Sequence, residues 1–456
     1  MKPDTAELAV DAGAHADRAP SRVRAWFSRL LADPARAAAL RDSWRALWIS
    51  RLLVWTAAAV TILALGFGPK RGAFDPPGMT RGFGWLGDLL AAPAARWDSA
   101  WYLVIAHYGY RPDLGSFTAS RTAFFPLYPL GIRGGSWLGL PPIAAGVLIS
   151  LAAFALALYG IHRLTTLELG GRDAARLAVL LTAFAPMAFF FSAVYSESLF
   201  LALSVGLFWS ARHGRWLAVG LLGALAAATR STGLVLLVPA LVVYLYGPRE
   251  DRAPDRPLAG RRRWLPCYRV RRELLWLGLI PLGMALFGLA LALGGGDAWA
   301  PLRAQQVWGR HFAGPYVAVW DGLKAAFEGA RQLLSFQREH VYFPAANGSP
   351  TVAAGHNLLM LGFLAAAVPA LIACWRRLPP AYGVYVLVAL AMPLSYPVGS
   401  EPLMSLPRFL LVLFPLTIAS AAWLAERPRA QPWLLGASGL SMAVFVAQFA
   451  TWHWVA

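Results

Sequence analysis

Residues 96–129 read RWDSAWYLVIAHYGYRPDLGSFTASRTAFFPLYP and combine charged, aromatic and apolar side chains in one short stretch. Within it, Trp97, Trp101 and Tyr108 recur at helical spacing, so they share one face of a helix. Trp and Tyr rings are favoured at the boundary between membrane and water. We therefore predict a short interfacial helix that begins at Asp98.

Asp98 has two interpretations. An Asp at the start of a helix commonly caps it, because its carboxylate accepts hydrogen bonds from the free N–H groups of the first turn. Alternatively, the carboxylate takes a proton from a hydroxyl group in a reaction at the membrane surface. Spacing alone leaves both open, so the rest of the chain has to decide.

Composition predicts an all-α polytopic membrane protein. Of the 456 residues, 58% are hydrophobic and only 14% are charged, and several apolar runs reach the ~20 residues that a helix needs to cross a bilayer. We predict one transmembrane domain over 47–456, preceded by a cytoplasmic tail, 1–46, with a basic amphipathic stretch. The net charge of +18 follows from Arg-rich inner loops, so no nucleic-acid partner is inferred.

The apolar runs predict about eleven transmembrane helices, with the N-terminus inside and the C-terminus outside. Arg-rich short loops fix this alternation. Two long outer loops, 68–137 and 295–353, are expected to carry short interfacial helices. The predicted spans are about 47–67, 138–160, 177–193, 198–211, 216–229, 232–247, 274–294, 355–374, 380–396, 409–425 and 432–450.

The polar clusters that suggest chemistry all fall on the predicted outer side. They surround Asp98, Glu197, Arg230, Arg310 and Arg408. The inner loops alone set the alternation, so this agreement is independent of it. We predict that these clusters form one polar site at the outer surface.

Each cluster also has a purely structural interpretation. Glu197 opens a span and compensates its helix dipole. Arg230 and Arg408 reach the lipid head groups from the ends of spans. Arg310 and His311 are solvated in their loop.

Together, however, the carboxylates and arginines describe a site for a phosphate-containing substrate, since Arg binds phosphate oxygens bidentately. No P-loop or dinucleotide glycine motif is present. Nucleotide sugars are scarce outside the cytoplasm, so a sugar donor with a phosphate there is most simply carried by a lipid.

The order of motifs resembles the PIG-V type of mannosyltransferase in the GT-C superfamily. RWD at 96–98 is followed by an Ile-Ala and Gly-Tyr stretch at 105–110 and by FFP at 124–126. Segments 195–198, 229–233 and 405–415 are similar to later signatures of that family. The similarity spans roughly 48–425.

The resemblance implies a multi-span, GT-C-like enzyme that uses polyprenyl-phosphate-mannose at the extracytoplasmic face. It implies inversion at the anomeric carbon, with an acidic residue of the first outer loop as base, and Asp98 matches by position. The chain departs from eukaryotic members in Ser99-Ala100-Trp101 and in its Lys-poor composition. It is similar to a bacterial member in a plasma membrane, which leaves the acceptor open between a glycolipid, a glycan and a protein.

Eleven residues receive predicted roles. Asp98 is the predicted base, and Arg230, Arg408 and Arg310 are predicted to bind the donor phosphate. The predicted substrate pocket contains Arg96, Trp97, Trp101, Tyr102, Tyr195, Glu197 and His311. No metal-binding cluster and no Asp-x-Asp pair is present, so no cofactor is assigned, and a divalent metal that bridges the phosphate stays open.

Two non-catalytic alternatives remain. A multi-span transporter fits the apolar segments, but it is expected to show internal repeats and ionisable residues at mid-membrane. A membrane subunit that presents lipid to a partner needs the aromatic loops but no particular carboxylate. Membrane lipids are expected partners under every interpretation.

Overall fold

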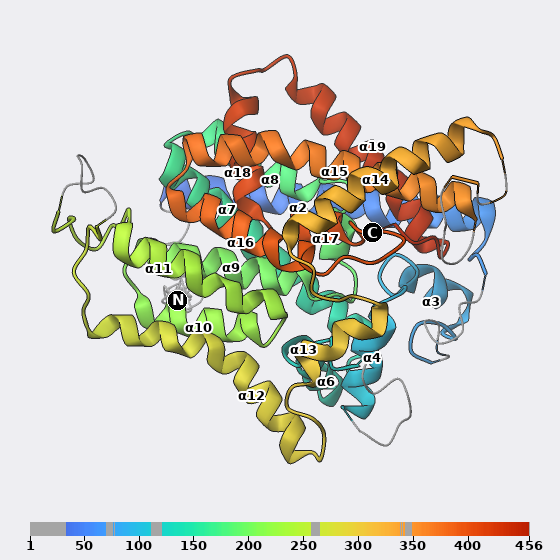
Figure 1. Ribbon diagram of the computed structural model, residues 1–456, viewed down its shortest axis with the longest axis horizontal. Coiled ribbons are helices and arrows are strands. Elements are labelled where there is room, and N and C mark those ends of the chain that lie inside the picture. Colours follow the sequence, from blue (N-terminus) through green and yellow to red (C-terminus); the bar gives the residue numbers. More distant parts are fainter. Residues whose placement is uncertain are drawn as a thin grey trace, which may run out of the picture.

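The computed structural model describes residues 33–69, 76, 78–110, 121–256, 265–337, 339, 341–342 and 349–455. Within these ranges every regular element is a helix, as predicted, and the helices pack into a bundle (Figure 1). The α-helices are α2 (Pro34–Leu65), α3 (Gly84–Ala91), α4 (Ser99–Tyr108), α6 (Leu127–Trp137), α7 (Pro142–Leu169), α8 (Arg172–Ala183), α9 (Glu197–Arg212), α10 (Trp216–Ala227), α11 (Leu237–Tyr246), α12 (Leu279–Leu293), α13 (Ala300–Arg303), α14 (Pro315–Leu334), α15 (Pro350–Arg377), α16 (Pro380–Leu394), α17 (Leu406–Leu411), α18 (Phe414–Ala425) and α19 (Gln431–Ala450).

Five helical segments of the described chain are long and apolar enough to cross a membrane. They are Pro34–Leu65, Pro142–Leu169, Arg272–Leu293, Pro350–Arg377 and Pro428–Ala450. Four shorter apolar segments accompany them: Trp216–Ala227, Ser231–Tyr246, Pro380–Leu394 and Phe414–Ala425. The protein is therefore a polytopic membrane protein. Each predicted span overlaps a helix, but the count of eleven transmembrane helices stays a prediction.

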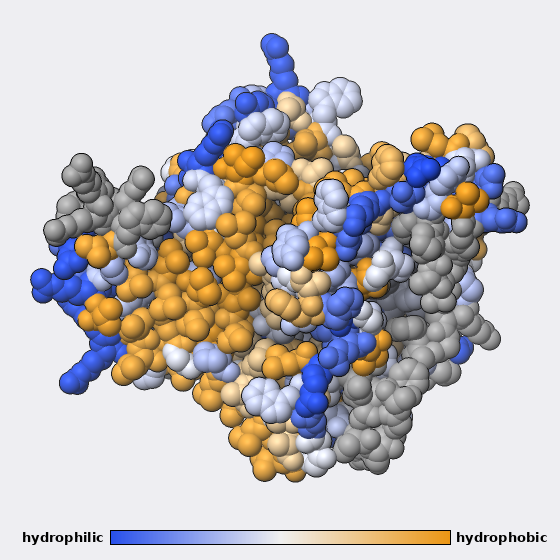
Figure 2. Space-filling model, in the orientation of Figure 1, coloured by the Kyte–Doolittle hydropathy of each residue, from blue (hydrophilic) through white to orange (hydrophobic). Residues whose placement is uncertain are grey.

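Apolar side chains cover a broad part of the surface over α11 and α16, whereas hydrophilic residues lie toward its edges (Figure 2). A continuous apolar surface of this kind marks contact with a membrane or with another protein. Because the same bundle contains helices of membrane-spanning length, lipid is the natural cover for this face.

Helix α2 begins earlier than the first predicted span. The Asp33 carboxylate accepts hydrogen bonds from the backbone N–H groups of Ala35 at 2.9 Å and Arg36 at 3.4 Å. Pro34 occupies the first turn, where its missing N–H costs nothing. Residues 34–46 of the predicted basic tail thus continue into the first span as one helix capped by Asp33, and residues 1–32 of that tail lie outside the described residues.

The third predicted span, 177–193, is wrong in its second half. Helix α8 ends at Ala183, and the chain then turns through a 3₁₀ helix, η2 (Ala188–Phe191), before α9 begins at Glu197. Pro186 explains the break, since it lacks an N–H group and disfavours helical geometry in the preceding residue. The 3₁₀ helix is fully buried, and it leads directly into the polar cluster around Glu197.

Arg51 on α2 supports this buried turn. Its Nη1 donates hydrogen bonds of 2.8 Å to the carbonyl of Ala188 and to Oγ of Ser192, and its Nη2 donates to the carbonyl of Ala183 at 3.3 Å. Backbone outside a helix requires such partners in a membrane protein, because lipid supplies none. Arg51 therefore replaces the hydrogen bonds that a continued α8 would have made.

We expect Arg51→Leu to lower the apparent melting temperature of the purified protein. Each buried acceptor left unpaired costs about 1–3 kcal/mol. Arg45→Leu is the matched control, because Arg45 lies on the same helix and is exposed, where substitutions change stability by about 0.5 kcal/mol or less. Equal melting temperatures for the two variants would show that the Arg51 contacts are dispensable.

Candidate active site

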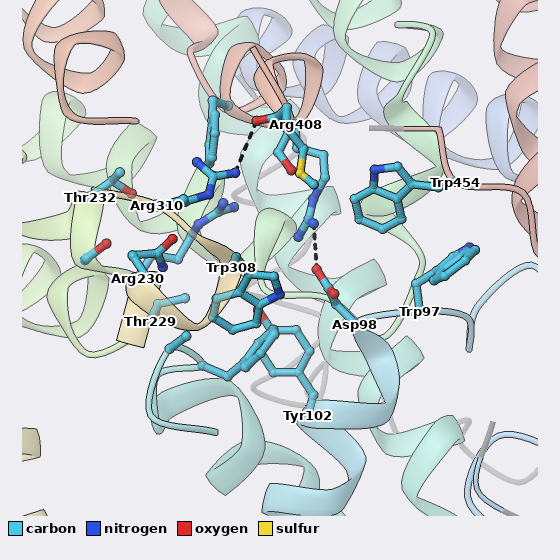
Figure 3. Close-up of a pocket in the computed structure, with 17 residues that line it drawn as sticks. Trp97, Asp98, Tyr102, Thr229, Arg230, Thr232, Trp308, Arg310, Arg408 and Trp454 are labelled. Carbon is cyan, nitrogen blue, oxygen red and sulfur yellow. Dashed lines mark hydrogen bonds and ion pairs between the residues drawn. The ribbon is translucent and has the colours of Figure 1, made fainter. Parts of the chain in front are cut away.

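A cavity of about 340 Å³ opens where six separate stretches of the chain meet (Figure 3). The structure thus brings together Asp98, Arg230, Arg310 and Arg408, as the alternation of loops predicted. The described residues that line it are Trp97, Asp98, Tyr102, Ala123, Phe124, Thr229, Arg230, Ser231, Thr232, Gln305, Trp308, Arg310, Met404, Ser405, Arg408, Phe409 and Trp454.

Asp98 lies directly before α4, in the position of a helix cap, but its side chain makes no capping hydrogen bond. Its Oδ2 instead accepts a hydrogen bond from Nη1 of Arg408 at 2.7 Å. About a fifth of the side chain is exposed (21%), and it points into the cavity (Figure 3). The capping interpretation is therefore wrong, and the carboxylate is available to a bound molecule.

The backbone before Asp98 adopts a rare conformation. Trp97 has a φ of 55°, in the left-handed region that residues other than glycine seldom adopt. Its ring meets the rings of Trp452 and Trp454 edge-on, with centroids 5.7 and 5.5 Å apart. Such backbone strain costs about 1–3 kcal/mol and persists only where the surroundings enforce it. The packing of the three tryptophans fixes the turn.

Tyr195 holds the same turn through hydrogen bonds to its backbone. Its hydroxyl donates to the carbonyl of Arg96 at 3.0 Å and accepts from the N–H of Asp98 at 3.1 Å. Tyr195 is fully buried, so it positions the turn and does not line the cavity. Arg96 is also buried, where it donates to the carbonyl of Ala450 at 3.2 Å and lies over the ring of Trp452.

Glu197 joins two of the arginines. It is fully buried at the start of α9, and its Oε1 accepts hydrogen bonds from Nε and Nη2 of Arg408 at 3.0 and 2.8 Å. The same oxygen lies 3.2 Å from Nη1 of Arg230. Glu197 thus stands behind the cavity and holds two guanidinium groups at its wall. Dipole compensation alone does not describe this role.

Arg310 is held differently. It donates to the backbone carbonyls of Tyr396 and Met404, both at 3.3 Å. Among the described residues no carboxylate lies within 4.0 Å of it, whereas Arg230 has Glu197 and Arg408 has both Glu197 and Asp98. Burial, with Arg408 nearby, lowers the pKa of Arg310 to about 10. The solvated interpretation of Arg310 is wrong, and its charge faces the cavity without a paired anion from the described chain.

Aromatic rings complete the wall around Asp98. Tyr102 donates to or accepts from Oγ of Ser196 at 2.9 Å, and burial raises its pKa to about 12. It therefore stays neutral at physiological pH. Phe124 lines the cavity, packs edge-on against Tyr102 and stacks on Trp101. Trp101 does not line the cavity itself but supports Phe124 through this stacking.

His311 does not join this site. It lines a separate depression with Asp321, Lys324 and Glu328, although Arg310 beside it lines the cavity. The two neighbours are adjacent in a non-helical stretch, and their side chains line different cavities. Of the predicted pocket residues, only Trp97 and Tyr102 line the cavity itself.

Several lining residues were not predicted. Trp308 and Gln305 belong to the same loop as Arg310, and that loop was singled out only for its charges. Trp454 follows the last apolar helix, and no periodicity or motif marks it. Ser405 also has a left-handed backbone, with a φ of 68°. Such a residue therefore precedes both charged groups in the sequence: Trp97 directly before Asp98, and Ser405 three residues before Arg408.

The donor set suits an anion better than a metal ion. Three guanidinium groups and one carboxylate, Asp98, line the cavity within the described ranges. Nowhere in those ranges do three or more His, Cys, Asp or Glu side chains gather at metal-binding distance. These residues therefore do not fit a resident divalent cation, and the excess positive charge fits phosphate oxygens.

Comparison with known proteins agrees with the resemblance of the motifs. Residues 85–246 match the family described as Mannosyltransferase (PIG-V). GPI alpha-1,6-mannosyltransferase 2 of Rattus norvegicus is 35% identical over 175 residues, which cover 36% of this chain and 34% of the relative. The same-named protein of Homo sapiens is 35% identical over 181 residues, which cover 36% of this chain and 34% of the relative. That of Mus musculus is 37% identical over 153 residues, which cover 31% of this chain and 30% of the relative.

The match confirms the predicted resemblance over residues 85–246, and the similarity predicted for the rest of 48–425 stays a prediction. The matched part covers about a third of the length of these relatives. The family match contains Asp98, Glu197 and Arg230 and ends before Arg310 and Arg408. The geometry of the cavity therefore carries the argument for the remaining two arginines.

Proposed function

We propose that this chain, which resembles PIG-V mannosyltransferases over residues 85–246, is a glycosyltransferase. It moves a mannosyl residue from a polyprenyl-phosphate donor to a glycolipid acceptor at the extracytoplasmic face of a membrane. One observation carries the proposal: among the described residues, a single carboxylate shares a cavity with three arginines. A base beside an anion-binding wall is the arrangement that glycosyl transfer from a phosphate donor requires.

The reaction is a single displacement. Asp98 removes the proton of an acceptor hydroxyl as its oxygen attacks the anomeric carbon of the sugar. The bond between that carbon and the phosphate oxygen breaks on the opposite side, and its electron pair stays on the phosphate. The products are the inverted glycoside, polyprenyl phosphate and protonated Asp98.

The arginines stabilise the charge of the leaving phosphate. Arg408 contacts Asp98 and therefore lies between the base and the phosphate wall. Arg310 is the cation with the most to gain from a ligand, because no carboxylate of the described chain neutralises its charge. We assign it the closest contact with phosphate.

An apolar groove supports a lipid-linked donor. It has a volume of about 350 Å³ and is lined by Leu234, Pro281, Met284, Ala285, Gly288, Leu289, Ala298, Trp299, Pro301 and Leu302. Leu234 lies two residues from Thr232 and Leu302 three residues from Gln305, both of which line the catalytic cavity. We assign the groove to the first isoprene units.

We expect Arg310→Gln to weaken binding of polyprenyl phosphate about tenfold or more. A hydrogen bond to a charged group contributes about 1.5–3 kcal/mol, and 1.4 kcal/mol is about tenfold in affinity. Titration of the detergent-solubilised protein with polyprenyl phosphate measures this. Arg133→Gln is the control, since Arg133 does not line the cavity. Equal affinities in the two variants would remove Arg310 from phosphate binding.

Ala285→Trp is expected to raise KM for a long-chain donor several-fold without changing KM for a short-chain analogue. The indole fills the groove, and Ala285 is exposed, so the change is tolerated by the fold. Ala292→Trp, at an exposed position of the same helix outside the groove, is the matched control. An equal effect on both donors would place the lipid chain elsewhere.

The activity is tested by transfer in liposomes. Wild-type protein and Asp98→Asn receive radiolabelled polyprenyl-phosphate-mannose with a crude extract of membrane lipids and glycans. Label in a new product with wild type alone supports the proposal, and the product identifies the acceptor. No transfer with intact donor, from mannose or other sugar donors, would favour the transporter or the lipid-presenting subunit.

A further inference from the structure

A second cavity follows helices α7 and α9 away from the candidate active site. It has a volume of about 740 Å³ and extends from Ile149 to Arg163 on α7 and from Leu199 to Trp209 on α9. At 1.5 Å per residue these stretches are about 15–21 Å long. This is close to half of the ~30 Å hydrocarbon core of a bilayer, so the trough spans about one leaflet.

The trough is a separate site. Helix α9 begins at Glu197 behind the catalytic cavity, and Trp209 lies twelve residues further on, about 18 Å along the helix axis. None of its lining residues lines the catalytic cavity. The proposed transfer reaction uses none of the residues that line it.

The trough is lined mainly by apolar side chains, several of them small. Leu156, Ala202, Leu203 and Gly206 line it, and Leu156 is largely exposed, as is Leu221 on the neighbouring helix α10. The trough therefore opens onto apolar surface in a helix pair that includes a segment of membrane-spanning length. An acyl chain fits this surface.

One end of the trough is positively charged. Arg36, Arg163 and Arg215 line it, and no carboxylate does so among the described residues. Arg36 is paired with Asp33 at 3.0 Å, so the charge available to a ligand comes from Arg163 and Arg215. Arg163 lies over the ring of Trp209, with its guanidinium carbon 5.6 Å from the ring centroid. Its Nη1 is buried and has no hydrogen-bond partner in the described part of the chain. A buried, unsatisfied guanidinium N–H requires an acceptor.

We propose that this trough binds one membrane phospholipid with an anionic head group. The phosphodiester accepts hydrogen bonds from Arg163 and Arg215, and an acyl chain lies along Ala202 and Gly206. The described lining contains arginines and no carboxylate. We therefore expect it to bind an anionic head group more tightly than a zwitterionic one.

Native mass spectrometry of the full-length protein in detergent tests the site, with phosphatidylglycerol and phosphatidylcholine as probes. We expect wild type to retain one phosphatidylglycerol in preference to phosphatidylcholine. The double variant Arg163→Gln, Arg215→Gln is expected to bind phosphatidylglycerol at least tenfold more weakly. Arg176→Gln, at an exposed position of α8 outside the trough, is the control and retains wild-type binding.

A second pair of variants tests the acyl chain. Gly206→Leu fills the trough and is expected to abolish retention with all arginines intact. Gly206→Ala is its control, because a Cβ at Gly206 meets Leu222 at an ordinary 3.4 Å. Equal retention of the two lipids, or unchanged binding in the double variant or in Gly206→Leu, would overturn the proposal. Lipid retention involves no sugar transfer, so its outcome is independent of the proposed reaction.

Discussion

Asp98→Asn is expected to reduce the proposed mannosyl transfer about a thousandfold while the protein inserts and folds normally. The amide has the shape of the carboxylate but does not accept the proton of the acceptor hydroxyl. General-base catalysis alone contributes about 10²–10⁴-fold. Because Arg408 keeps two hydrogen bonds to Glu197, the wall of the cavity is retained in this variant.

The measurement is the initial rate of transfer in liposomes, together with the affinity for polyprenyl phosphate and the melting temperature. A loss of rate with unchanged affinity and stability identifies a residue that acts in the chemical step. Asp88→Asn is the matched control, since Asp88 lies in the same predicted outer loop and does not line the cavity. A rate within about tenfold of wild type would remove Asp98 from the role of base.

Glu197→Leu is expected to destabilise the protein severely. The substitution leaves the guanidinium groups of Arg408 and Arg230 without the carboxylate that they share. Breaking a buried ion pair by removing one partner typically costs about 3–5 kcal/mol. We therefore expect a strongly lowered melting temperature and loss of the folded species after solubilisation.

A paired substitution separates charge from packing. In Glu197→Gln the side chain keeps its size but loses its charge, so intermediate stability is expected, with weaker placement of Arg408. Glu168→Gln is the control. The Glu168 carboxylate lies 2.7 Å from the guanidinium group of another buried arginine, Arg212, and neither residue lines the cavity. Wild-type stability of Glu197→Leu would contradict the assigned role.

Local patterns predicted the parts of the site that depend on sequence neighbours. The spacing of aromatic residues predicted the short helix α4, although Trp97, which was counted in that spacing, lies outside the helix with a left-handed backbone. Basic inner loops predicted which polar clusters come together. Asp98, Arg230, Arg310 and Arg408 were expected in one cavity for this reason, and they meet there. Their chemical roles stay predictions until the variants are measured.

Other features depend on three-dimensional packing and were beyond these patterns. Pro186 ends α8 inside an apolar run, and average hydropathy does not register a single proline. His311 lines a different cavity from Arg310, because adjacent residues point in different directions and membership of one loop does not place both in one site. Trp454 reaches the cavity only because the chain after α19 folds back toward Trp97.

The pairing of Glu197 with distant partners also constrains how the protein is made. Arg230 follows Glu197 by 33 residues, but Arg408 follows it by 211. At roughly 5–20 residues per second, the ribosome needs about 10–40 s to reach that partner. During this interval the Glu197 carboxylate, which is buried in the folded protein, has at most Arg230 as a partner and lacks Arg408. We therefore expect the contact between Glu197 and Arg230 to form first, and the polar cluster to be completed only when α17 emerges and the bundle closes.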